Sequence, residues 1–239
     1  MSSEFEARLR RAKLDAMKEL AYGASHEINN PLANIAARAQ TLLRDEQQPD
    51  RRRALEAIHL QAMRAHEMIS DLMLFARPPA LVLERVDLNE LITEVTKNLA
   101  EECERRQVRL QLKLPEPSQA ITGDAQQLSI ALTALCTNAV EAIGTDGTIE
   151  ISVREIEQPA GAVTIDVMDT GPGISDEVRG HLFDPFFSGR EAGRGLGFGL
   201  SKCWRIVTDH GGTVVVSSEP SEGTTISLQL PKVNAISKA

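Results

Sequence analysis

Apolar side chains recur at helical spacing through the first eighty residues. In the first stretch the repeat is every seven residues, through Ala7, Leu14, Ala21, Ile28, Ile35 and Leu42. After a polar turn it continues in steps of three and four, through Leu55, Ile58, Ala62, Ala65, Ile69, Leu72 and Ala76. Both spacings place apolar residues on one face of a helix. The sequence therefore predicts two long helices, the first over 4–44 and the second beginning after Asp50, which could serve as its N-cap.

Two helices joined by a short turn form an antiparallel hairpin. Each helix has one apolar stripe, and a single hairpin would leave part of that surface exposed to water. Pairing two hairpins into a four-helix bundle would bury it, so we expect a homodimer. The alternative is that the hairpin docks on the C-terminal part of its own chain. Consecutive prolines in Arg77-Pro78-Pro79 end a helix, and they place the boundary of this domain at 1–79.

One segment of the first helix, 25–32, reads Ser-His-Glu-Ile-Asn-Asn-Pro-Leu. His26 stands two positions before Ile28, about 200° around a helix, so it is expected to point away from the apolar seam. Pro31 cannot donate to the carbonyl of Glu27, and the helix is expected to kink or loosen there. A carboxylate beside an imidazole can fix its tautomer and help remove a proton, which makes His26 a candidate reactive group. The other histidines are expected to be solvated surface residues: His59, His66, His181 and His210.

Beyond residue 80, strand and helix patterns alternate. Helices are predicted to begin after Asp87 and Asp124, with Gln127 in capping-box position, and to end near 104 and 143; a further helix is expected over 200–209. The strands expected between them are 83–86, 108–114, 148–155, 163–168, 214–217 and 225–230. Helices on one face of a mostly antiparallel or mixed sheet form a two-layer α/β sandwich. The predicted fold class is α+β, with the second domain over 80–233 and a tail over 234–239.

Four segments of this second domain carry candidate chemistry. Asn138, in the helix after Asp124, offers an amide oxygen suited to Mg²⁺. Asp169 leaves the end of a strand before a Thr-Gly-Pro-Gly turn, and a buried carboxylate there could accept from an exocyclic amine. Alternating glycines over 193–199 precede a helix and would let backbone N–H groups approach an anion. The fourth segment, 182–187, ends in two phenylalanines and by itself is more typical of a core.

Charge and composition exclude several classes of protein. The net charge is −8, and residues 81–239 carry 23 acidic against 14 basic side chains, so the basic footprint of a nucleic-acid-binding protein is missing. Three widely spaced cysteines form neither a disulfide framework nor a zinc site. No apolar stretch approaches the roughly 18 residues of a membrane span, and no secretory signal opens the chain. We therefore expect a cytoplasmic chain with no membrane segment and no nucleic-acid partner.

Taken in order, these segments resemble the two-component sensor histidine kinases over nearly the whole chain. The segment 25–32 is similar to the family's H box, and Asn138 stands in its N box. The first glycine box, the F box and the second glycine box correspond to 169–173, 184–187 and 195–200. The resemblance implies a helical dimerisation and phosphoacceptor domain followed by an ATP-binding domain of the superfamily shared with gyrase, MutL and the heat-shock chaperone ATPase. In detail these motifs look most like those of nitrogen-regulation-type kinases.

The resemblance implies that ATP and Mg²⁺ phosphorylate His26 and that an aspartate of a response-regulator receiver domain then accepts the phosphoryl group. Glu27 would act as base or orienting group, and Asn30 would position water when such a kinase runs as a phosphatase. Asn138 would hold Mg²⁺ and Asp169 would read adenine. The remaining nucleotide contacts implied are Gly171, Gly173, Phe187, Arg190, Arg194, Gly195, Leu196, Gly197 and Gly199.

Two positions depart from the family pattern. Ala134 stands where many members have a second Asn and where the superfamily's ATPases have a water-activating Glu; Glu141 stands where other subfamilies have Lys. Because alanine cannot activate water, Ala134 disfavours an ATP-driven clamp. Two alternatives stay open: such a clamp, and a degenerate kinase that serves as a dimeric scaffold. No sensory module is visible, so we expect an upstream sensor module or partner to supply the input.

Overall fold

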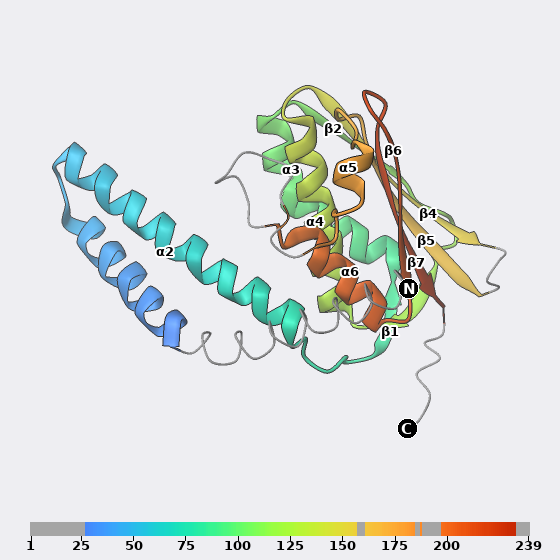
Figure 1. Cartoon of the computed structure of the whole chain (residues 1–239), viewed down its shortest axis with the longest axis horizontal. Helices are drawn as coiled ribbons and strands as arrows, with labels where there is room; N and C mark the ends of the chain where they lie inside the picture. The colour runs from blue at the N-terminus through green and yellow to red at the C-terminus, as the bar shows by residue number, and fades with distance from the viewer. Residues whose placement is uncertain (1–26, 157–160, 185–186, 188–196, 233–239) are drawn as a thin grey trace. The chain divides into compact units, whose positions relative to one another are not determined.

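The computed structural model describes residues 27–156, 161–184, 187 and 197–232. The chain divides into two compact units, Met1–Pro79 and Ala80–Ala239, and each is described by itself (Figure 1). Among the described residues, no helix combines the length and the apolar character needed to cross a bilayer.

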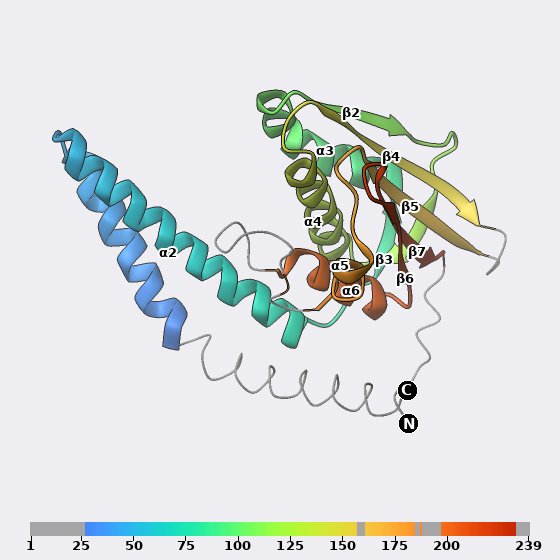
Figure 2. The ribbon, with the colours of Figure 1, turned by 45° about the horizontal axis from the view of Figure 1, so that its top comes forward.

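The first unit is an antiparallel hairpin of a helix over 27–45 and α2 (Pro49–Ala76) (Figures 1 and 2). The prediction that Asp50 caps the second helix is wrong, because the N-cap is Gln48 and it makes no side-chain capping bond. Pro49 begins the helix instead, at a position where its missing N–H has no intrahelical partner to lose. Asp50 lies inside the first turn, where it forms an ion pair with Arg53.

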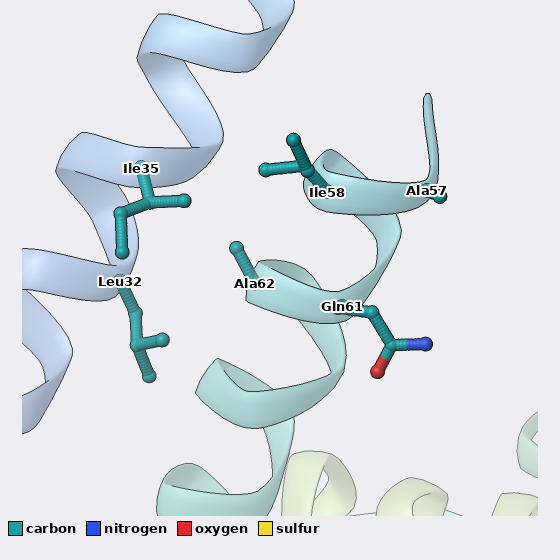
Figure 3. Close-up of a pocket in the computed structure, with 6 residues that line it drawn as sticks. All are labelled: Leu32, Ile35, Ala57, Ile58, Gln61 and Ala62. Carbon is teal, nitrogen blue, oxygen red and sulfur yellow. The ribbon is translucent and has the colours of Figure 1, made fainter. Parts of the chain in front are cut away.

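One face of the hairpin is apolar and exposed. Ile28, Ile35 and Leu42, the described part of the seven-residue seam, are 41%, 45% and 60% exposed, whereas the small Ala36, Ala39 and Ala62 are buried. The seam therefore does not fill the interior of the hairpin. A shallow hollow of about 400 Å³ opens on the two helices (Figure 3), and its lining is almost entirely apolar: Leu32, Ile35, Ala57, Ile58, Gln61 and Ala62.

The helices of the second unit begin where the sequence places their caps. The Asp87 carboxylate accepts from the backbone N–H groups of Asn89 and Glu90 at the start of α3 (Leu88–Arg105). Asp124 accepts from the N–H of Gln127 at 3.0 Å at the start of α4 (Ala125–Ile143). Both predicted caps are confirmed. Among the described residues, the other helices of this unit are α6 (Gly199–Asp209) and the single turn α5 (Asp176–Arg179), which was not predicted.

A mixed five-stranded sheet forms the second layer. Its order is β2 (Val108–Lys113), β4 (Gly147–Ile156), β5 (Ala162–Asp169), β7 (Gly223–Pro231) and β6 (Thr213–Glu219). Only the β2–β4 pair is parallel. A separate antiparallel pair joins β1 (Glu84–Asp87) to β3 (Ala120–Gly123), and β3 was not predicted. Helices α3, α4 and α6 lie on one face of the large sheet (Figures 1 and 2), which confirms the two-layer α/β sandwich.

The core of the sandwich lies between these layers. The sheet contributes fully buried aliphatic side chains such as Ile149, Ile165 and Leu228, and the helices contribute Leu132 and Ile206. The free thiols of Cys103, Cys136 and Cys203 are also buried, one on each of α3, α4 and α6. Burial raises the pKa of Cys136 and of Cys203 to about 12, so both thiols are protonated at neutral pH.

Candidate nucleotide and phosphoacceptor sites

Asp169 ends β5 in the middle of the sheet and is 5% exposed. Its register partners are Ile149 on β4 and Thr224 on β7. The carboxylate Oδ1 accepts from the backbone N–H of Gly171 at 2.8 Å. Burial raises the pKa of Asp169, while the N–H groups of Gly171 and Thr224 oppose the rise. The fold thus holds a partly desolvated acceptor in a fixed orientation.

The turn after Asp169 is locked on both sides. The Thr170 hydroxyl accepts from the N–H of Thr148 at 2.9 Å. Gly173 has φ +73°, in the left-handed region, and a Cβ there would lie 2.1 Å from the carbonyl oxygen of Glu219. Glycine is therefore required at this position both for backbone conformation and for space. The N–H of Ile174 then donates to the hydroxyl of Ser218 at 2.9 Å, which ties the end of the turn to β6.

The same turn packs against α4. A Cβ at Gly171 would lie 2.7 Å from Asp169 Oδ1 and 3.3 Å from the carbonyl carbon of Ala142. Asn138 precedes Ala142 by four residues, so the two share one face of the helix, and Asn138 is half-buried there. The structure therefore brings the predicted N-box residue and the predicted first glycine box together, on neighbouring elements.

The second glycine box is described from residue 197 onward. Gly197 has φ +68°, and buried Phe198 is the N-cap residue of α6. The N–H of Lys202 donates to the Phe198 carbonyl at 2.8 Å and closes the first turn. At Gly199, in contrast to Gly173, space does not require glycine, because an added Cβ would meet no atom within 4 Å. Backbone N–H groups at the start of a helix favour an anion. Four predicted contacts lie outside the described residues: Arg190, Arg194, Gly195 and Leu196.

Phe187 of the F box is described and half-buried, and it packs on a histidine. Its ring centroid lies 5.5 Å from that of His181, and its N–H donates to the Asp184 carbonyl at 3.2 Å. His181 Nδ1 in turn lies 2.9 Å from Asp184 Oδ2. His181 is exposed as predicted, and it contacts both the Asp184 carboxylate and the Phe187 ring of the F box.

The phosphoacceptor segment is described from Glu27, and His26 itself lies outside the described residues. Glu27 and Asn30 are both exposed. The helix continues through Pro31, where the missing N–H removes the helical bond to the Glu27 carbonyl. Asn34 Nδ2 donates to the carbonyl oxygen of Asn30 at 3.1 Å, a side-chain bond that adds to the helix beside the proline.

Three histidines expected on the surface are bonded inside the fold, and that prediction is wrong for them. His210 is 1% exposed; its Nδ1 donates to the Ile206 carbonyl at 2.8 Å and its Nε2 accepts from the N–H of Asp124 at 2.9 Å. His210 thereby occupies the place expected for Gln127 in the capping box of α4. His59 and His66 are half-buried on α2 and bond to the first helix.

Comparison with known proteins agrees with this architecture. Residues 16–81 match the family described as the His Kinase A (phospho-acceptor) domain, and residues 123–234 match the histidine kinase-, DNA gyrase B- and HSP90-like ATPase family. The sensor histidine kinase ZraS of Escherichia coli (strain K12) is 32% identical over 225 residues, which cover 93% of this chain and 47% of ZraS. The chain thus spans about half the length of the curated relatives it matches.

Solved structures show the same fold. Full-length ShkA in complex with AMPPNP matches with a TM-score of 0.80 and 24% identity, over 92% of this chain and 47% of that one. The histidine kinase ThkA in complex with the response regulator protein TrrA matches with a TM-score of 0.69 and 24% identity, over 98% of this chain and 67% of that one. A phosphoacceptor hairpin joined to an ATPase-type sandwich defines a histidine kinase core. The chain belongs to the two-component sensor histidine kinases.

Proposed function

We propose that this chain uses Mg-ATP to phosphorylate His26 and passes the phosphoryl group to an aspartate of a response-regulator receiver domain. One observation carries the proposal. The buried Asp169 carboxylate is fixed by the Gly171 N–H beside the Asn138 face of α4, in a chain whose hairpin bears the His-Glu motif at 26–27. An adenine acceptor, a phosphate-side amide and a nucleophile are then present in one polypeptide.

In the second unit, Asp169 accepts from the exocyclic amine of adenine. The glycine turns at Gly171 and Gly173 leave room for close approach of the nucleotide, and the start of α6 favours its negative charge. Additional phosphate and lid contacts are proposed for Phe187, Arg190, Arg194, Gly195, Leu196, Gly197 and Gly199.

Asn138 suits a magnesium ion because its amide oxygen is a hard donor, half-buried next to the glycine turn. Mg²⁺ keeps few protein ligands in nucleotide sites and takes the rest from phosphate oxygens and water, so one amide is a sufficient protein contribution. When bound, the ion neutralises charge on the phosphates. Ala134, half-buried one turn before Asn138, has no group that could activate water.

In the reaction, an imidazole nitrogen of His26 attacks the γ-phosphorus in line. The N–P bond forms, the bond to the β,γ-bridging oxygen breaks, and ADP leaves with that electron pair. Glu27 takes the proton lost by the ring or orients the ring for attack. Positioning contributes most of the acceleration in such transfers, because little covalent chemistry falls to the protein. Exposed Asn30 would position water when the protein dephosphorylates its regulator.

We propose two partners for the hairpin. Its exposed aliphatic face and the hollow at Leu32 and Ile58 support a homodimer that buries both in a four-helix bundle. The structure of ThkA with its response regulator supports a receiver domain as the second partner. We further propose that the chain belongs to the nitrogen-regulation subfamily, that an upstream sensor module supplies its signal, and that it acts in the cytoplasm.

Labelling with γ-³²P ATP tests the proposal on wild-type protein and His26→Gln. Wild type should gain acid-labile, alkali-stable label that mass spectrometry places on His26, and His26→Gln should gain none while it keeps its dimer and its nucleotide affinity. Asn138→Asp should weaken Mg-ATP binding and leave the hairpin folded. Label on another side chain, or rapid phosphate release with no labelled protein, would contradict the kinase and favour the ATPase clamp. An unlabelled protein that binds a receiver domain in Mg-ATP would favour the scaffold.

A further inference from the structure

Within the described part of the phosphoacceptor segment, a side-chain pair links the segment to the opposite helix of the hairpin. Half-buried Asn29 presents its Oδ1 to Nδ1 of His66 on α2, at 3.1 Å. An amide oxygen can only accept, so Nδ1 of His66 carries the proton and donates it. In the sequence, Asn29 stands three positions after His26 and directly before Asn30. The bond therefore involves a residue in the middle of the proposed reactive motif, 25–32.

This motif lies in a turn that lacks a backbone bond. Pro31 has no N–H, so the Glu27 carbonyl loses its partner one turn ahead, although the helix runs on through 27–45. Two side chains support the turn in its place: Asn34 Nδ2 donates to the Asn30 carbonyl at 3.1 Å, and His66 holds Asn29. Of these two, His66 comes from the other helix, so its bond links the turn to α2.

A matched pair on the same helix separates this bond from general hairpin stability. His59 precedes His66 by seven residues, is also half-buried, and its Nδ1 donates to the Ala36 carbonyl at 3.1 Å. Both histidines thus bridge the same two helices by one Nδ1–H bond of equal length. The partner of His59 lies ten residues beyond His26 in sequence, outside the motif.

We propose that His66 is a positioning residue for phosphoryl transfer: its bond to Asn29 holds the proline-weakened turn of the phosphoacceptor segment in one orientation relative to α2. The assignment rests on the proposed function. In-line transfer requires the attacking nitrogen at a defined distance and angle, and small misplacement is costly in rate. A turn with one backbone bond missing would sample more orientations once the cross-helix bond is removed.

The test compares His66→Leu, His66→Asn and His59→Leu with wild type in the intact chain. For each, autophosphorylation of His26 is followed at several ATP concentrations, together with the thermal midpoint and the dimer state. His66→Leu should lower kcat by about tenfold with KM for ATP unchanged, because the proposed nucleotide contacts are in the other unit. His66→Asn, whose amide N–H can replace Nδ1–H, should restore most of the rate. His59→Leu should lower the midpoint as much as His66→Leu does and leave kcat near that of wild type.

Asn29→Leu removes the acceptor instead of the donor and gives a second route to the same result. It should reproduce the loss of His66→Leu, and the double variant should be no slower than either single one. Equal losses of kcat in His66→Leu and His59→Leu, or a wild-type rate in both His66→Leu and Asn29→Leu, would overturn the assignment. Wild-type protein that gains no label on His26 would overturn the proposed function itself, and the positioning role with it.

Discussion

Replacing Gly171 by alanine should weaken nucleotide binding without unfolding the sandwich. Gly171 does not have a positive φ, so its backbone accommodates alanine. The new Cβ would lie 2.7 Å from Asp169 Oδ1, and the backbone of α4 at Ala142, 3.3 Å away, blocks retreat on the other side. The carboxylate must therefore move outward by about 0.7 Å to reach ordinary contact distance, which breaks its 2.8 Å bond to the Gly171 N–H.

The loss of one hydrogen bond to a charged group costs about 1.5–3 kcal/mol, and a displaced Asp169 no longer meets the adenine amine. Calorimetry with a non-hydrolysable ATP analogue and Mg²⁺ should show Kd raised by about 10- to 100-fold. Losing the hydrogen bond from the N–H of residue 171 also removes an interaction that lowers the pKa of Asp169. As the pH falls, the carboxylate of the variant should therefore be protonated, and binding lost, at a higher pH than in wild type.

Gly180→Ala is the matched control for this variant. Gly180 has φ −62° and a Cβ there would meet nothing closer than the Glu177 carbonyl oxygen at 3.7 Å. Its affinity and thermal midpoint should equal those of wild type. A folded Gly171→Ala protein with wild-type nucleotide affinity would refute the placement of Asp169 in the binding site.

Three further predictions concern the sandwich. Asp124→Ala should cost about 2 kcal/mol in urea unfolding, and Asp124→Asn less. Burial acts to raise the pKa of Asp124, but hydrogen bonds, first that from the Gln127 N–H, outweigh burial and lower the pKa below 3.8. The contribution of Asp124 to folding stability is therefore complete above pH 3.8 and is lost as the pH falls through the lower pKa of the folded state. Measuring the free energy of unfolding at a series of acid pH values would reveal this loss. His210→Leu leaves the buried Asp124 N–H unpaired, while the Ile206 carbonyl keeps its bond from the backbone N–H of residue 210. It should cost about 1–3 kcal/mol, and wild-type stability would contradict its capping role. Cys136 and Cys203, with pKa about 12, should resist Ellman's reagent at neutral pH until the protein unfolds; rapid native labelling would contradict their burial.

The parts of the fold that sequence predicted well depend on neighbours in the chain. Asp87 and Asp124 cap helices through N–H groups two or three residues away, so the cap and its partners are visible together in one short segment. Long alternating strands such as β4 and β5 were found for the same reason. The four-residue β3 and the single turn α5 were missed because neither is long enough to show a period.

The errors fall where partners are distant. His210 bonds to Asp124 across 86 positions and His66 to Asn29 across 37, and no local pattern marks either pair. The motifs of the proposed nucleotide site include Asn138 and the 169–173 turn, and the structure places the two on neighbouring elements. The motifs could not explain why residue 173 must be glycine. The reason is the close approach of the Glu219 carbonyl, which the pairing of β6 with β7 brings there.

The place of β7 in the sheet has a consequence for biosynthesis. This strand, 223–231, pairs with both β5 and β6, and its Ile226, Leu228 and Leu230 are buried. On the ribosome, Asp169 therefore has no Thr224 beside it until almost the entire second unit has been translated. The hairpin, built from contacts near in sequence, can fold early, while competence to take up nucleotide is expected to arise only after residue 231 is released. Nascent chains halted before β7 should accordingly dimerise but not yet bind nucleotide.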